Sequence, residues 1–136
     1  MNLVVDASII VAWLLEDENS AAAESVAIHV VEDGAWVPQL FPIEIANVLL
    51  QAVRRRRITP DHADEQLRNL ADMLFTVDSE TSAHSWTATY TLAVEEGLTV
   101  YDATYLELAE RRDAVLATLD TQLAAAARRR GLTVVP

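Results

Sequence analysis

Short, almost continuously apolar runs alternate along this chain with longer stretches in which apolar residues recur every three or four positions. The short runs predict buried strands and the longer stretches predict helices, because strands and helices bury side chains with different periods. We expect strands at 2–5, 35–37, 98–101, 114–118 and 132–135, with a poorer edge strand at 75–77. We expect helices at about 7–15, 21–31, 42–57, 60–74, 81–96, 103–112 and 121–130.

Strands this short and apolar, separated by helices, predict a parallel sheet that is covered on both faces. The fold class is therefore α/β: a three-layer α/β/α sandwich around a central parallel sheet of four or five strands. A length of 136 residues without a Gly-, Ser- or Pro-rich linker predicts a single domain, 1–136. The longest apolar run, 7–15, is shorter than the ~20 residues of a membrane span, and the N-terminus lacks a leader's basic flank, so we expect a cytoplasmic protein without a membrane partner.

Composition excludes several classes of enzyme. The chain has no cysteine, and all ten of its basic residues are arginine, so it has no lysine either. Thiol catalysis, cysteine-ligated zinc, Schiff-base chemistry and a P-loop lysine are therefore excluded. The formal net charge of −11 disfavours bulk electrostatic binding of nucleic acid.

Three aspartates each follow an expected strand and precede an expected helix: Asp6, Asp102 and Asp120. Because the carboxyl ends of parallel strands share one edge of a sheet, we expect these side chains to lie close together. Any one of them alone is explained as a helix N-cap, a position that aspartate favours. Carboxylates about 4 Å apart repel by about 4 kcal/mol at an effective dielectric of about 20, so a cluster of three favours a divalent cation site.

A fourth carboxylate, Glu44, lies in an expected helix that is apolar on nearly every side. Burying it is costly unless something pairs with it. Asn47 and Gln51 follow at helical spacing, and this polar stripe faces either solvent or a metal. Four carboxylates without cysteine suit one or two Mg²⁺ or Mn²⁺ ions, which points to a metal-dependent phosphodiesterase or nuclease.

Four segments carry a resemblance to a known family: VVDASIIVAWLL (4–15), PIEIANVL (42–49), GLTVYDATYLELAERR (97–112) and ATLDTQL (117–123). They resemble the PIN domain, and most closely the VapC-type toxins of bacterial toxin–antitoxin pairs. The resemblance implies that the catalytic, metal-binding carboxylates are Asp6, Glu44, Asp102 and Asp120. It also makes Ser8, Asn47 and Thr118 candidates for supporting these carboxylates.

The same resemblance implies a Mg²⁺- or Mn²⁺-dependent endoribonuclease that cleaves RNA by attack of an activated water on a phosphodiester. It implies a homodimer and a cognate VapB-type antitoxin that blocks the acidic groove, with DNA reached only through the antitoxin. The alternative is a non-catalytic PIN-like module that binds a protein partner through an acidic pocket.

Four consecutive basic residues lie at the far end of the Glu44 helix: Arg54, Arg55, Arg56 and Arg57. They are either contacts for RNA phosphates, which arginine binds well, or a solvated helix end. Tyr101 and Tyr105 flank Asp102, and we assign both to packing rather than to chemistry.

Overall fold

The computed structural model describes residues 2–18 and 20–136. It contains a five-stranded sheet in the order β3-β2-β1-β4-β5. Every neighbouring pair of strands is parallel, which confirms the α/β fold predicted from the sequence. The strands are β1 (Leu3–Val5), β2 (Ala35–Val37), β3 (Phe75–Val77), β4 (Val115–Ala117) and β5 (Val134–Val135).

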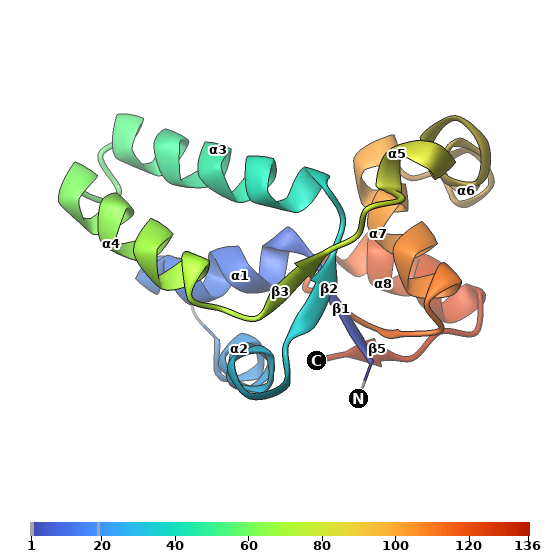
Figure 1. Ribbon diagram of the computed structural model, residues 1–136, viewed down its shortest axis with the longest axis horizontal. Coiled ribbons are helices and arrows are strands. Elements are labelled where there is room, and N and C mark those ends of the chain that lie inside the picture. The colour runs from blue at the N-terminus through green and yellow to red at the C-terminus, as the bar shows by residue number, and fades with distance from the viewer. Residues whose placement is uncertain (1, 19) are drawn as a thin grey trace.

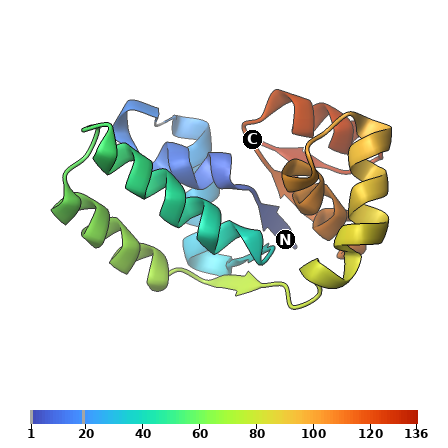
Figure 2. The same ribbon diagram turned by 90° about the horizontal axis from the view of Figure 1, so that it is seen from above.

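The helices of the first half of the chain lie to one side of the strands, and those of the second half lie to the other (Figures 1 and 2). The first group comprises α1 (Ala7–Leu14), the 3₁₀ turn η1 (Glu16–Glu18), α2 (Ala21–Asp33), α3 (Leu40–Arg54) and α4 (Pro60–Ala71). The second group comprises α5 (Thr81–His84), the π-helical segment η2 (Ser85–Thr89), α6 (Tyr90–Glu96), α7 (Val100–Arg111) and α8 (Thr121–Arg129). No helix within the described ranges is both long and apolar enough to cross a membrane.

The core lies where β1 and β4 meet helix α7. Val4, Val5 and Leu116 of the strands have no exposed area, and neither do Leu106 and Leu108 of α7. Helix α7 packs against both strands and against α6 and α8, so it is buried on nearly every side. Its position in the fold is therefore fixed by apolar packing along most of its length.

The predicted strand at 98–101 is wrong. Gly97 ends α6 with a left-handed φ of +65°, and Thr99 is the N-cap of α7, whose hydroxyl accepts the Asp102 N–H at 3.1 Å. Val100 and Tyr101 are helical, and they are 42% and 66% exposed. The β-branched and aromatic run was typical of a strand, but the threonine cap gives the backbone a helical alternative with its own hydrogen bond.

The pairing of β1 with β4 brings two chain segments together at the carboxyl edge of the sheet. Val5 is in register with Ala117, and the Asp6 N–H continues the ladder by donating to the Ala117 carbonyl at 3.0 Å. Asp6 and Thr118, which follow these strands, are therefore neighbours although they are far apart in sequence. This edge of the sheet is where the candidate site lies.

Candidate active site

Asp6 is the most buried of the four carboxylates, at 5% exposure, and it is the N-cap of α1. Its Oδ1 accepts the Ser8 N–H at 3.0 Å and the Ser8 hydroxyl at 2.5 Å. Its Oδ2 accepts the Thr118 hydroxyl at 2.5 Å. Burial raises the pKa of Asp6 above its ordinary value, although these hydrogen bonds act in the opposite direction. Capping alone does not require two further hydroxyls on the same carboxylate.

The two hydroxyls that bind Asp6 are themselves oriented by the backbone. The Ser8 Oγ accepts the Leu119 N–H at 2.9 Å, and the Thr118 Oγ1 accepts the Asp120 N–H at 3.0 Å. Each hydroxyl therefore has its acceptor side occupied and directs its proton at Asp6. The structure thus places Ser8 and Thr118, both candidates from the sequence, directly against this carboxylate.

Two further carboxylates lie at the N-terminal ends of α7 and α8. Asp120 is the N-cap of α8 and accepts the Leu123 N–H at 2.9 Å, while Asp102 lies half-buried in the first turn of α7. Burial raises the pKa of Asp102, and the neighbouring charge of Asp120 raises it further. The two residues are therefore close enough to repel each other through space, as the sequence predicted, although Asp102 follows a helix cap and not a strand.

Glu44 approaches the same edge from α3. It is half-buried, and its Oε1 accepts the Tyr105 hydroxyl at 2.5 Å. Burial is the main cause that raises the pKa of Glu44; the Tyr105 hydrogen bond lowers it, and the charges of Asp6 and Asp102 raise it. Electrostatic coupling thus links Glu44 to Asp6 and Asp102, and Asp102 to Asp120. We call these four carboxylates the acidic edge.

The acidic edge fits a hydrated divalent cation better than a closed metal cage. In residues 2–18 and 20–136, no group of three or more carboxylate or histidine side chains is placed tightly enough to hold an ion by itself. Over the same ranges, none of the four carboxylates forms an ion pair with an arginine or a histidine. Mg²⁺ keeps several of its waters and needs only one or two direct carboxylates, so mutually repelling oxygen donors without a basic partner suit it.

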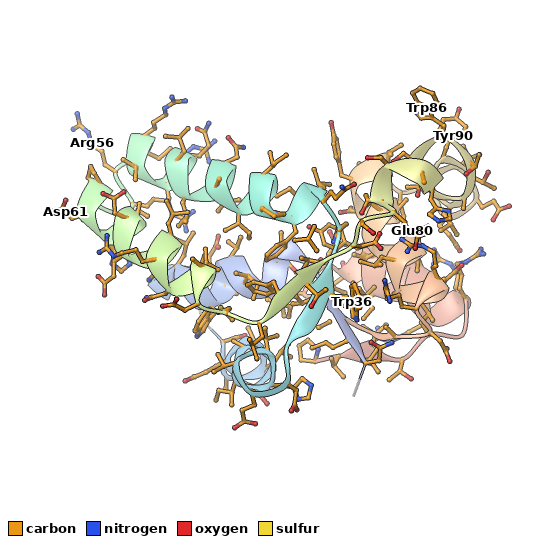
Figure 3. All side chains as sticks on the ribbon, in the orientation of Figure 1. Trp36, Arg56, Asp61, Glu80, Trp86 and Tyr90 are labelled. Carbon is orange, nitrogen blue, oxygen red and sulfur yellow. The ribbon has the colours of Figure 1, made fainter. Side chains whose placement is uncertain are left out.

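The remaining candidates lie away from these contacts. Asn47 is exposed one turn after Glu44, and no hydrogen bond of its side chain is found within the described ranges. Arg54 follows Glu44 by ten positions, which at the helical rise is about 15 Å. Arg56 lies at the outer end of the α3–α4 hairpin in Figure 3, and Arg57 is bound to Asp17 at 2.8 Å. The structure thus brings together the carboxylates and hydroxyls, but not the arginines.

Sequence reasoning missed Tyr105. Tyr105 packs in the core at 2% exposure, as its assignment to packing predicted, but its hydroxyl also donates a hydrogen bond to Glu44, which the sequence did not predict. One signal for this contact was present: Tyr105 follows Asp102 by three positions on the same helix, which places both on one face. A phenol on the face that carries a candidate carboxylate is a candidate donor to the others.

Comparisons with known proteins show the family and agree with the fold. The PIN domain family model matches residues 3–129. Ribonuclease VapC3 of Pyrobaculum aerophilum is 36% identical over 124 residues, which are 91% of this chain and 93% of the relative. The crystal structure of PAE2754 from Pyrobaculum aerophilum superposes with a TM-score of 0.71 at 26% identity, over 99% of this chain and 90% of that chain.

A third similarity concerns the fold alone. VapBC2 from Rickettsia felis, bound to a DNA fragment from their promoter, superposes with a TM-score of 0.63 at 9% identity, over 98% of this chain and 97% of that chain. A parallel α/β domain with carboxylates gathered at the carboxyl edge of its sheet has the oxygen donors that a metal-dependent phosphodiesterase needs. The chain belongs to the PIN domain family, and its curated relative places it among the VapC-type members, as the sequence segments predicted.

Proposed function

We propose that this protein is the ribonuclease toxin of a toxin–antitoxin pair, and that the acidic edge is its metal-binding catalytic centre. The observation that carries the proposal is the convergence of Asp6, Glu44, Asp102 and Asp120 on one edge of the sheet. These residues come from four different elements, and none of them has a basic partner within the described ranges. Its VapC-type family membership supports the same activity.

Each residue of the acidic edge has a defined task in this proposal. Asp6, Glu44, Asp102 and Asp120 would hold one or two Mg²⁺ or Mn²⁺ ions, and Ser8 and Thr118 keep Asp6 oriented for that purpose. A bound ion of this kind supplies a water of lowered pKa and positive charge to balance the phosphate. Water would then be the nucleophile, and with the 3′-oxygen as the leaving group the products would carry 5′-phosphate and 3′-hydroxyl ends. Asn47, exposed on the next turn of α3, is free to contact RNA or a bound water.

The arginines at the end of α3 extend the proposed RNA path. Arg54, Arg55 and Arg56 make no ion pair within the described ranges, whereas Arg57 is engaged by Asp17 and Glu18. Arg54 lies ~15 Å along α3 from Glu44 of the acidic edge. Successive nucleotides of a single strand are several ångströms apart, so a few nucleotides of RNA span this distance. We therefore assign phosphate contacts to the first three arginines and a weaker contribution to Arg57.

The partner of this toxin is a cognate VapB-type antitoxin. Within the described residues no arginine or histidine pairs with the acidic edge, so an antitoxin that inserts arginines there would satisfy the carboxylates and block the metal site. VapBC2 from Rickettsia felis, which has a similar fold, is bound to a DNA fragment from its promoter. For the present protein we propose that DNA is reached only through the antitoxin. We further propose a homodimer in the cytoplasm, where the RNA substrate lies.

The test is cleavage of an RNA pool by the purified, antitoxin-free protein with Mg²⁺, with Mn²⁺ and with EDTA. We expect discrete cuts that require the metal and fall at least ~100-fold in an Asp6→Asn, Asp102→Asn double variant. The matched control is Asp61→Asn, Asp64→Asn, which removes two exposed carboxylates of α4. Asp61 lies at the outer end of the α3–α4 hairpin in Figure 3.

Three outcomes would contradict the proposal. Cutting that survives EDTA or the double variant would mean that the acidic edge is not the catalytic centre. Products with 2′,3′-cyclic phosphate ends would show that the 2′-hydroxyl of the RNA, and not water, attacks. A folded protein that neither cuts RNA nor binds Mn²⁺ would favour the non-catalytic module.

A further inference from the structure

We propose that Tyr105 is a positioning residue that sets Glu44 in place for the metal through the hydrogen bond between its hydroxyl and Glu44 Oε1. This inference rests on the proposed function, because it assigns Glu44 to the metal site. It deepens that function by adding a residue that is neither a carboxylate nor a ligand.

The first support is the geometry of the contact. The Tyr105 hydroxyl lies 2.5 Å from Glu44 Oε1, a short distance typical of a hydrogen bond to a charged acceptor. Tyr105 is 2% exposed, so the ring cannot move away from Glu44 without disturbing the core. Within the described ranges, no other side chain donates a hydrogen bond to Glu44, and its Oε2 is left for another partner.

The second support is the position of the contact in the fold. Helix α3, which carries Glu44, packs against α1 and α4, whereas α7 packs against β1, β4, α6 and α8. These helices belong to the two groups that lie on opposite sides of the strands in Figure 2. The Tyr105–Glu44 hydrogen bond therefore joins the two groups at the acidic edge. No other side-chain hydrogen bond between α3 and α7 is found within the described ranges, so this bond is the contact that orients the Glu44 carboxylate toward α7.

The third support is that the same helix supplies a ligand and this donor. Asp102 and Tyr105 are separated by three positions on α7, so any shift of the helix moves both together. The Tyr105 hydroxyl donates its proton to Glu44 Oε1, so Tyr105 acts here as a neutral hydrogen-bond donor. The phenol thus holds Glu44 at a fixed distance from Asp102 and contributes no negative charge of its own.

The experiment compares the wild-type protein with Tyr105→Phe, which keeps the buried ring and removes only the hydroxyl. Mn²⁺ binding, followed by electron paramagnetic resonance of the free ion, is measured beside thermal unfolding and RNA cleavage. We expect Mn²⁺ affinity to fall about 10–100-fold, which is typical for loss of a group that orients a metal ligand. Cleavage should need correspondingly more metal and recover at least in part at saturating Mn²⁺. Tyr90→Phe is the matched control, because Tyr90 is 59% exposed on α6.

A double-mutant cycle tests whether Tyr105 acts through Glu44. In a Glu44→Gln background, Tyr105→Phe should change Mn²⁺ affinity less than about twofold. Equal effects of Tyr105→Phe in the two backgrounds would overturn the inference, as would unchanged Mn²⁺ affinity of the single variant. A wild-type protein that binds no Mn²⁺ would instead overturn the proposed function, and the inference with it.

A measurement on the wild-type chain covers the case in which Tyr105→Phe fails to fold. The chain has three tyrosines, so ¹³Cζ-tyrosine labelling gives three resolvable signals, which Tyr90→Phe and Tyr101→Phe variants assign. Addition of Mg²⁺ should shift the Tyr105 signal, because the charge on its hydrogen-bond acceptor changes, and leave the Tyr90 signal in place. A Tyr105 signal that does not respond to saturating Mg²⁺ would contradict the positioning role.

Discussion

At the scale of single residues, Asp6 shows how this chain maintains a buried charge. A carboxylate at 5% exposure is costly, and four donors offset that cost: two hydroxyls and the backbone N–H groups of Ser8 and Ile9. Burial still dominates, since the pKa of Asp6 remains raised. The four hydrogen bonds stabilise the ionised form of Asp6, and within the described residues no basic side chain pairs with it.

A substitution of Thr118 tests this arrangement. Thr118→Val keeps the shape of the side chain but removes the proton donated to Asp6 and the acceptor of the Asp120 N–H. We expect unfolding in urea to show a loss of ~1–3 kcal/mol, the cost of leaving buried polar groups unpaired. Metal-dependent cleavage should fall as well, because Asp6 and Asp120 both lose a constraint. The control is Thr133→Val, whose threonine is exposed; equal effects of the two variants would contradict the role of Thr118.

The carboxylates and their donors were proposed for different reasons. Asp6 and Asp120 each follow an apolar strand, and Glu44 is a charge in an apolar helix. Ser8 and Thr118 were proposed from the resemblance to the PIN domain, and the structure places both hydroxyls against Asp6. The bond from Tyr105 to Glu44 spans 61 positions. It depends on how α3 and α7 approach each other, which no local pattern encodes.

At the scale of elements, the short strands were predictable because each is a compact apolar run next to a turn residue. The strand predicted at 98–101 failed because local propensity and side-chain capping favour different structures there. Thr99 decides the outcome by accepting the Asp102 N–H, and the flanking Val100 and Tyr101 remain exposed. In a buried strand these two side chains would lie in the core. In the structure they lie exposed on the first turn of α7, and later residues of that helix fill the core.

The cap that begins α7 is therefore expected to matter for function as well as for stability. Thr99→Ala removes the hydroxyl that accepts the Asp102 N–H, and should cost ~1 kcal/mol. Asp102 lies in that first turn, so cleavage should fall by more than the loss of folded protein explains. Unfolding in urea and RNA cleavage are measured on the same preparations.

Thr59→Ala, at the N-cap of α4, is the matched control for Thr99→Ala. Thr59 caps α4 in the same way, accepting the His62 N–H at 3.1 Å, far from the acidic edge. Thr59→Ala should cost a similar free energy of unfolding and leave cleavage by the folded protein unchanged. If both variants lose activity in proportion to stability alone, the cap of α7 has only a structural role.

At the scale of the whole molecule, charge is the feature that distinguishes this chain. Its net charge is −11, and three of the four acidic-edge carboxylates have raised pKa values, chiefly because they are buried. One buried carboxylate elsewhere behaves in the opposite way: Asp78 has its pKa lowered, chiefly by the bond from Arg111. Asp78 is thus paired with an arginine, whereas the carboxylates of the acidic edge have no basic partner within the described residues.

This contrast predicts how the stability of the metal-free protein depends on pH. A carboxylate whose folded pKa is raised binds a proton at higher pH when folded than when unfolded, so acid favours the folded state. Between the raised pKa values and the ordinary values of 3.8 and 4.5, Asp6, Glu44 and Asp102 therefore make the protein more stable as pH falls. Asp78 acts oppositely, but only below its ordinary 3.8. We therefore expect Tm in EDTA to rise as pH falls from neutrality towards the ordinary range of carboxylate pKa values.

Two comparisons distinguish the effect of the acidic-edge carboxylates on Tm from the effect of the general loss of negative charge as pH falls. An Asp6→Asn, Glu44→Gln, Asp102→Asn variant should lose most of this pH dependence, whereas Asp61→Asn, Asp64→Asn should retain it, because those two carboxylates are exposed. Saturating Mg²⁺ should flatten or reverse the slope for the wild type, since the ion favours the ionised carboxylates and stabilises the folded state most where they are deprotonated. Parallel pH curves for the wild type and the triple variant would show that the buried carboxylates do not set the slope, and that the net charge alone does.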